Sequence, residues 1–356
     1  MEQLQTFAKR LRLARIKAKL SMQSLSESMD GLVSKQAISK YESAKMMPDS
    51  TVLIALAKAL AVSVDYFFRP FSFDTDNFKV SFRKKASAGT KETEALKAQI
   101  QDRVERYIEV EQLLMVAQPK LPDYSGKPIE NDDDMVAQAN KIRQEWNLGD
   151  DPISNVQDML ESHGIKVVLV DAPTEFDGVS GIVNDQHFFI VLNNNILNSE
   201  RKRFTALHEL AHLLYNRHFA EHLREKERER LCNTFASEML IPGTVLLRLI
   251  PNLKRISVVS LANLGGVYGI SPDALVFALH RLKVISDSRY KGYFINKSRN
   301  PELKAYLEAS QFSEPASNRF RSLVFTALAQ QLITSSKAAS LLGVPLKEVR
   351  NQSNSL

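Results

Sequence analysis

The sequence predicts a multidomain protein that is mainly helical and contains one small β-sheet. Its 356 residues suit two or three domains of ordinary size. Apolar residues recur at helical spacing along most of the chain, and short strand-like runs are confined to a few segments. The composition is 44% hydrophobic and 25% charged, close to that of average globular chains. Collagen-like, disordered and disulfide-scaffold proteins are therefore excluded.

Charge and cysteine content indicate the compartment and the class of partner. Lys and Arg number 47 and Asp and Glu number 41, so the net charge is +6. This mild basicity permits a nucleic-acid partner without demanding one. One cysteine, Cys232, forms no intrachain disulfide, which favours a reducing compartment. No apolar run reaches ~18 residues and the N-terminus does not resemble a secretory signal, so we expect a cytoplasmic protein and no membrane partner.

We divide the chain into four parts: helical residues 1–69, a linker with a long helix at 70–134, an α+β domain at 135–295, and a helical module at 296–356. After Pro70, Phe78, Val80 and Phe82 alternate with polar residues and predict a short strand or extended linker. The helix expected at 91–117 has an apolar seam of Ile100, Val104, Tyr107 and Leu114, interrupted by Glu111. That seam packs either on its own chain or on a second copy in a homodimer.

Residues 1–69 have the spacing of a helix-turn-helix. Leu25 and Met29 lie on one face of a short helix, and a turn containing Gly31 follows. Ser34 is a natural N-cap for the next helix, 35–41. In that helix Ala37, Ile38 and Tyr41 form a narrow buried stripe, whereas the polar residues face outward. The outward residues are Lys35, Gln36, Ser39 and Lys40.

These residue types suit the major groove of a double-stranded DNA operator. Gln pairs with adenine, Lys reaches guanine acceptors, and Ser contacts base or phosphate. We expect Ser34 to contact the DNA as well, and phosphate contacts from Lys45, Arg10, Arg12 and Arg15. Residues 33–42, followed by Pro48, Leu53, Ala57, Leu60, Val62, Ser63 and Tyr66, resemble the phage-repressor-like Xre family. The resemblance implies a five-helix DNA-binding domain. The alternative is a helical bundle that contacts only protein.

The segment departs from the Xre pattern at two places. The turn before Ser34 is long, with Asp30, Gly31 and Leu32, and Ser43 and Ala44 stand where a glycine is usual. Both changes would shift the recognition helix.

The middle of the chain predicts helices at 135–146 and 152–163, strands at 165–170, 176–183 and 187–192, and two strong helices at 199–216 and 221–239. The last two strands read as a hairpin. Asp132, Asp133 and Asp134 suit the start of the first helix, where negative charge favours the helix dipole. A small strand is expected at 293–295, and apolar helices at 255–285.

The most specific indication of chemical function in the sequence is a His-Glu-x-x-His motif. His208 and His212 are one helical turn apart and can bind one zinc ion, while Glu209 can act as general base. Two residues are candidates for the third ligand. Glu229 lies on the following helix. Asn233 is one helical turn after Glu229 and could orient a metal-binding histidine by a hydrogen bond. His218 has the third-ligand spacing of metzincins, but Tyr215 replaces the required glycine, so we favour Glu229.

Cys232, Glu225, Glu227 and Glu238 are chemically able to bind a metal but are less well placed. We expect Cys232 to be a small buried packing residue.

Residues 200–242 resemble the ImmA/IrrE-type metallopeptidases. The resemblance rests on Arg201, Phe204 and Thr205 before His208, and on Glu229, Asn233, Phe235, Ala236 and Pro242 after it. Cys232 replaces the usual alanine. The resemblance implies an α+β, zincin-like zinc endopeptidase, gated in its activity, that cleaves a repressor, toxin or other regulatory protein in a stress response, mobile element or toxin–antitoxin pair. The alternative is a repressor or antitoxin that binds DNA and a partner protein without proteolysis, its zinc site structural or vestigial.

Two further expectations concern surfaces. Residues 187–192 are either an edge strand that holds substrate or an ordinary buried hairpin strand. Residues 338–346, with Gly343 between two helices, have helix-turn-helix spacing. They form either a second DNA reader or, as we favour, a packing or dimerisation module.

Overall fold

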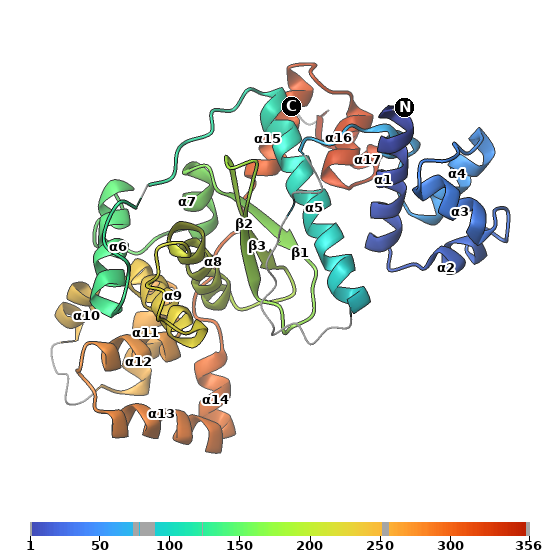
Figure 1. The fold of residues 1–356 in the computed structure, drawn as a ribbon. Helices are drawn as coiled ribbons and strands as arrows, with labels where there is room; N and C mark the ends of the chain where they lie inside the picture. The colour runs from blue at the N-terminus through green and yellow to red at the C-terminus, as the bar shows by residue number, and fades with distance from the viewer. Residues whose placement is uncertain (1, 74–77, 79–89, 123, 251–255, 354–356) are drawn as a thin grey trace. The chain divides into compact units, whose positions relative to one another are not determined.

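The computed structural model describes residues 2–73, 78, 90–122, 124–250 and 256–353. They form two compact units, Met1–Ala117 with Asn318–Leu356, and Gln118–Ser317. The predicted architecture, mainly helical with a small sheet, is confirmed (Figure 1). The extended segment expected at 78–82 lies, apart from Phe78, outside the described residues.

The first unit begins with the expected five-helix bundle, of which the last helix is a 3-10 helix. Its core contains Phe7, Leu11, Leu25, Ile38 and Leu56, each fully buried. Side chains of Ser21, Ser34 and Asp49 cap the helices that follow them, as their residue types predict. The elements are α1 (Glu2–Lys17), α2 (Met22–Glu27), α3 (Lys35–Glu42), α4 (Ser50–Ala59) and η1 (Val64–Phe68).

The same unit contains α5 (Thr90–Leu113) and three C-terminal helices, α15 (Arg319–Ala329), α16 (Ser335–Leu342) and α17 (Leu346–Ser353). The predicted seam of α5 packs within its own unit. Tyr107, for example, is buried and its ring centroid is 5.1 Å from that of Phe320. Glu111, which interrupts the seam, accepts a hydrogen bond from Arg319 at 2.7 Å. The seam therefore favours packing on the chain itself and no longer supports the homodimer.

Ion pairs attach α1 to α5. Arg10 donates to Glu105 Oε2 at 2.7 Å, and both side chains are fully buried. Lys17 donates to Asp102 at 2.8 Å, and Arg106 donates to the same carboxylate at 2.7 Å. Because a buried charge is costly without a partner, these pairs fix how α1 lies against α5.

The second unit contains the sheet, formed by β1 (Lys166–Val170), β2 (Gly178–Val183) and β3 (His187–Asn193) in the order β1-β3-β2. The predicted hairpin is confirmed, since β2 and β3 pair antiparallel with Ser180 opposite Ile190. However, β3 also pairs in parallel with β1. The expectation that 187–192 is an edge strand is therefore wrong, because both sides of β3 are already hydrogen-bonded. Strand β2 is at an edge instead.

Helices α7 (Val156–Ser162) and α8 (Ser199–Tyr215) pack against this sheet in the second unit. The strand expected at 293–295 is wrong: these residues lie in α13, because Tyr290, Tyr293 and Phe294 recur at helical spacing and Ser286 caps the helix. The helices are α6 (Asp132–Glu145), α7 (Val156–Ser162), α8 (Ser199–Tyr215), α9 (Glu225–Leu240), α10 (Gly243–Leu249), α11 (Val258–Tyr268), α12 (Pro272–Arg281), α13 (Asp287–Arg299) and α14 (Pro301–Glu308).

Helix α8 lies beside β2 on one side and α9 on the other (Figure 1). Gly178 permits this approach, because a Cβ at that position would be 2.8 Å from the Thr205 side chain. Leu207, Leu210 and Ala211 of α8 are fully buried in the unit's core. In the described part of the chain, no helix is both long enough and apolar enough to cross a membrane.

Candidate metal centre and DNA-binding surface

The two histidines of the motif lie on the face of α8 that turns toward α9. Asn198 caps α8 by accepting a hydrogen bond from Arg201 N at 2.8 Å, and the apolar face of the helix is held in the core. The side chains of His208 and His212 are 12% and 11% exposed. They are thus held in place while remaining reachable by a small ion or molecule.

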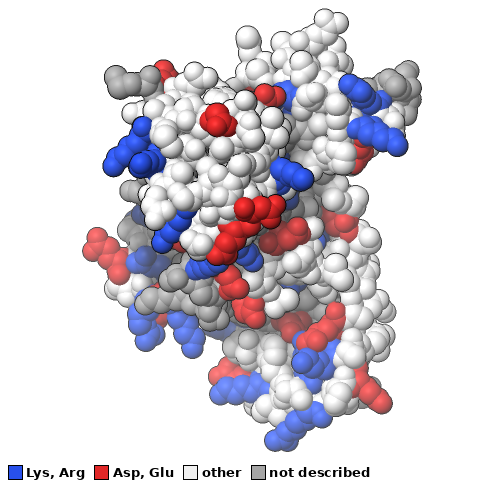
Figure 2. Space-filling model, turned by 90° about the vertical axis from the view of Figure 1, so that its right-hand side faces the viewer, with Lys and Arg blue, Asp and Glu red and all other residues white. Residues whose placement is uncertain are grey.

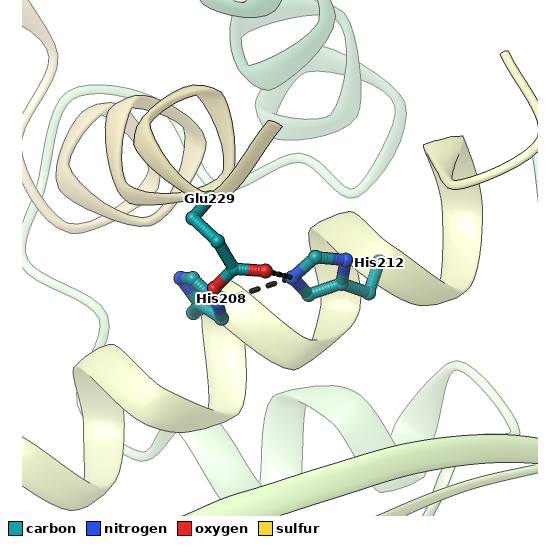
Figure 3. A group of neighbouring side chains, drawn as sticks. All are labelled: His208, His212 and Glu229. Atoms are coloured by element: carbon teal, nitrogen blue, oxygen red, sulfur yellow. Dashed lines mark hydrogen bonds and ion pairs between the residues drawn. The ribbon is translucent and has the colours of Figure 1, made fainter. Parts of the chain in front are cut away.

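Glu229 on α9 completes a converging group of three (Figure 3). Its two carboxylate oxygens lie 3.4 Å from His208 Nε2 and 3.5 Å from His212 Nε2. The two Nε2 atoms are 3.1 Å apart. Among the described residues, this is the group of His, Cys, Asp and Glu side chains that is arranged to hold a metal ion.

The size of this triangle suits a tetrahedral ion. Zinc binds nitrogen and oxygen at roughly 2.0–2.1 Å, so donor atoms at the corners of a tetrahedron are about 3.4 Å apart. The two Nε2 atoms are 3.1 Å apart, and each lies 3.4 or 3.5 Å from a different oxygen of the Glu229 carboxylate, which is close to that value. Two imidazoles and one carboxylate are also a donor set that leaves a fourth position open. The residues present therefore fit a divalent metal such as Zn²⁺.

Residues behind the histidines fix the orientation of the rings. His208 Nδ1 lies 2.8 Å from Asn233 Oδ1, as the sequence predicted for Asn233. Because an amide oxygen only accepts, the proton is on Nδ1, and the Nε2 lone pair faces the centre. Cys232 Sγ is 3.6 Å from His212 Nδ1 and is fully buried. Cys232 thus packs in the core, as expected, and additionally contacts a candidate ligand.

Glu209 faces the sheet side of α8. Its carboxylate accepts a hydrogen bond from Ser180 Oγ of β2 at 2.9 Å, and the residue is 6% exposed. The sequence did not predict a role for Ser180, because the contact depends on how β2 packs on α8. This hydrogen bond holds the side chain of the predicted general base against the edge strand.

The other residues considered as ligands have different partners. The imidazole of His218 packs against the Tyr124 ring at 4.9 Å, outside the group of three. Glu238 accepts hydrogen bonds from Gly243 N and Arg281. Glu227 accepts from Arg224 N at 2.9 Å and closes the first turn of α9. The geometry therefore favours Glu229, although no ion is present to test the ligand set.

Polar contacts that the sequence did not predict hold α8 and α9 in position. Arg203 of α8 is fully buried, donates to Glu314 and to Gly269 O, and lies over the Phe312 ring. Asp132 accepts a hydrogen bond from Thr234 Oγ1 of α9 at 2.7 Å. Asp132 thus anchors α9 in addition to lying in the first turn of α6, which Asn131 and Asp134 cap.

The predicted DNA-contacting residues of α3 are all on the surface. Ser34 caps α3 by accepting from Ala37 N at 3.2 Å, and Ile38 and Tyr41 are buried. This orientation leaves one polar face outward, with an exposed lysine after the helix. The exposed residues are Ser34, Lys35, Gln36, Ser39, Lys40 and Lys45.

Two of the expected phosphate contacts are wrong. Arg10 is fully buried, pairs with Glu105 and donates to Arg69 O. Arg15 donates to Glu42 Oε2 at 2.7 Å and to Leu20 O, and so joins α1 to α3. Each of these arginines forms an ion pair with a glutamate from a distant segment of the same unit, so neither charge is available to a phosphate. Arg12 is exposed and stays a candidate.

Both departures from the Xre pattern have a backbone consequence. Asp30 and Gly31 in the long turn have φ of 52° and 71°, and Ala44 has φ of 55°. Ala44 thus adopts the left-handed conformation that the usual glycine would adopt without strain. Helix α3 still ends at Glu42.

Charges of both signs occur on the face of the molecule displayed in Figure 2. On the face displayed in Figure 2, Lys and Arg occur in several separate groups, with Asp and Glu among them. This face therefore presents no continuous basic patch of the kind that binds nucleic acid without defined contacts.

Comparison with known families matches two segments of the chain. Residues 160–280 match the family described as IrrE N-terminal-like domain, and residues 11–67 match the helix-turn-helix family. No curated protein matches the chain. The first match contains the converging group of His208, His212 and Glu229, and the second contains α3 with its exposed polar face. The chain is a fusion of an Xre-like helix-turn-helix domain with an IrrE N-terminal-like domain of the peptidase type.

Proposed function

We propose that this protein is a DNA-binding transcriptional regulator whose IrrE-like domain is a zinc-dependent endopeptidase that cleaves a regulatory protein. The observation that carries the proposal is the convergence of His208, His212 and Glu229 beside Glu209. The exposed face of α3 supports the DNA-binding half. His208, His212 and Glu229 would hold the metal, and Glu209 would be the catalytic base.

When bound, Zn²⁺ would polarise the scissile carbonyl and lower the pKa of water toward ~7. Glu209 would take the proton from the attacking water and return it to the leaving amine. Ser180 donates a hydrogen bond of 2.9 Å to the Glu209 carboxylate, and so restricts its orientation. Asn233 keeps the His208 Nε2 lone pair directed at the centre.

The substrate chain would add to the edge of β2 that pairs with no other strand among the described residues. This strand pairs with β3 on one side, and Ser180 places it next to Glu209. An extended peptide can pair with such an edge through main-chain hydrogen bonds and so lie across the site. The role that the sequence analysis gave to 187–192 thus passes to β2 (Gly178–Val183).

The test compares the wild-type chain with Glu209→Gln. We expect about one zinc per chain in both, and in the variant a loss of peptide-bond cleavage of about 10²–10⁴-fold. Cleavage is measured by comparing new protein N-termini in cells that express each form. Glu225→Gln is the matched control, because Glu225 is an exposed glutamate on α9 outside the group of three.

A second candidate function is repression by contact, with DNA and a partner protein bound and no proteolysis. It is favoured if the regulatory phenotype survives Glu209→Gln while zinc is retained. If the wild-type chain binds no metal even when zinc is supplied, the peptidase proposal is wrong and the DNA-binding half is unaffected.

A further inference from the structure

The C-terminal helices of the first unit form a second helix-turn-helix. Thr334 caps α16 by accepting from Lys337 N at 3.2 Å. The helix ends at Gly343, whose φ of 71° allows the chain to turn while Gly343 N and Val344 N both donate to Ala339 O. Only Gly343, Val344 and Pro345 separate α16 from α17. A three-residue turn containing glycine is the connection typical of DNA-binding helix-turn-helix motifs.

The buried face of this module is already occupied. Val324 and Ala327 of α15, Ala338 and Leu341 of α16, and Val349 of α17 form one cluster with Val110 of α5. Each of these side chains is at most 1% exposed. The buried side chains of this cluster therefore account for the packing role that we expected for the module. The side of α17 opposite Val349 does not contribute to that cluster.

That opposite face is basic and polar. Lys347, Arg350 and Asn351 are exposed, and their spacing of three and four residues puts them on one side of α17. Residues 318–356 contain five Lys or Arg and one Asp or Glu. Two of the five, Arg319 and Lys337, pair with glutamates of α5. The single acid, Glu348, pairs with Arg321 at 3.6 Å. No large apolar side chain of the described part of α17 is exposed.

We propose that α17 is a second DNA-contacting helix, which binds the duplex through Lys347, Arg350 and Asn351. Lys and Arg are the residues that neutralise phosphates and reach guanine, and Asn pairs with adenine. A protein-docking face would instead present aromatic or apolar anchors. The inference goes beyond the proposed function, which places DNA contact on α3 alone.

Helix α5 connects this module to the first DNA-binding domain. Arg106 donates to Ser340 O at 2.9 Å and Leu341 O at 3.2 Å, at the end of α16. The same guanidinium donates to Asp102, which also accepts from Lys17 of α1. One turn of α5 therefore contacts both helix-turn-helix modules. DNA contacts made by α17 would add to those made by α3 on one duplex, because both modules belong to one compact unit.

The test uses the full chain and 40-base-pair duplexes (about four turns) that the wild-type chain enriches from a random-sequence pool. The variant is Lys347→Glu with Arg350→Glu. The matched control is Lys291→Glu with Arg299→Glu, two exposed residues of α13 in the other unit, which change the net charge equally. We expect the affinity to fall about tenfold or more beyond the control, and the nuclease footprint to become shorter.

A second variant, Lys347→Gln with Arg350→Gln, measures the number of phosphate contacts. The slope of log affinity against log salt should become shallower by about 1.8, since each lost contact contributes about 0.9. Thermal unfolding of all variants should match wild type, because the substituted side chains are exposed.

The outcomes separate this inference from the proposed function. If the α17 variants bind no more weakly than the control while Lys35→Gln with Gln36→Ala abolishes binding, α17 does not contact DNA and the inference is wrong. If the wild-type chain enriches no duplex, both the inference and the DNA-binding half of the proposed function are contradicted.

Discussion

Two clusters of charged and polar side chains, one in each unit, differ in how their members face one another. In the first unit, Arg10 faces Glu105 and Lys17 faces Asp102, so each buried acid lies against a base. In the second unit, the lone-pair side of His208 Nε2 and the carboxylate of Glu229 are directed at the same point, 3.4 Å apart. The first cluster is neutralised internally, and the second has the arrangement of side chains that could hold a cation.

The difference in pairing matches a difference in exposure. Arg10 and Glu105 are fully buried, whereas the side chain of Glu229 is 31% exposed. A buried pair of opposite charges holds two segments together and excludes ligands, while partly exposed donors at 3.1–3.5 Å can accept an ion from solution. A cluster of polar side chains therefore indicates a ligand site when its members can all donate an electron pair to a cation, as His208, His212 and Glu229 can. It does not indicate one when positive and negative members pair with each other.

The largest expected effect comes from breaking the paired cluster. Arg10→Ala should lower the stability of the first unit by about 3–5 kcal/mol, because it leaves Glu105 charged and buried without its main partner. The measurement is hydrogen exchange of the α1 and α5 amides, which reports on this unit separately from the other. Zinc content should not change.

Two controls sharpen this prediction. Arg12→Ala, at an exposed position two residues on, should change stability by no more than about 0.5 kcal/mol. Arg10→Met combined with Glu105→Leu should restore much of the loss, since no unpaired charge is left. If Arg10→Ala is as mild as Arg12→Ala, the cluster does not hold α1 to α5.

A substitution in the converging cluster should instead change metal affinity and leave the stability of its unit nearly unchanged. Asn233→Ala removes the acceptor for His208 Nδ1–H and should weaken zinc binding about 10–100-fold with little change in unfolding. Asn233→Asp keeps an acceptor oxygen and should lose less. Affinity is measured by competition with a chelator of known zinc affinity. Equal zinc affinity in wild type and Asn233→Ala would show that the ring is oriented by the helix alone.

The comparison of the paired cluster with the converging cluster also explains which features could be predicted from the sequence. The convergence of His208, His212 and Glu229 could be predicted because the three residues lie on two consecutive helices at a recognisable spacing. The Ser34 cap and the buried stripe of α3 could be predicted for the same local reason. These features depend on residues within a few helical turns of one another.

The features that could not be predicted depend on distant segments. Arg10 and Glu105 are 95 residues apart, so Arg10 looked like any basic surface residue of α1. The pairing of β1 with β3 is equally non-local, and it is the reason that β3 is central and β2 is the edge. Ser180 gained its role only through that placement. Long-range pairing thus accounts for the wrong assignments of Arg10, Arg15 and residues 187–192.

The smallest expected effect is a pH dependence that belongs to the paired cluster. Burial disfavours the charge of Asp102, but the positive charges of Arg106 and Lys17 outweigh it and hold the pKa of this carboxyl well below its ordinary value. The folded state therefore binds the proton less tightly than the unfolded state. The stabilisation by Asp102 is complete above the unfolded pKa of ~3.9 and is lost as the pH falls below it.

The stability difference between wild type and Asp102→Asn should consequently be constant from about pH 7 to 5 and shrink between about pH 4 and 3. It is measured by hydrogen exchange of the α5 amides at each pH. Asp65→Asn, at an exposed position of the same unit, is the control and should give a small difference throughout. A difference that grows on acidification would mean that Asp102 is held as the neutral acid, and the cluster would then not be one of paired charges.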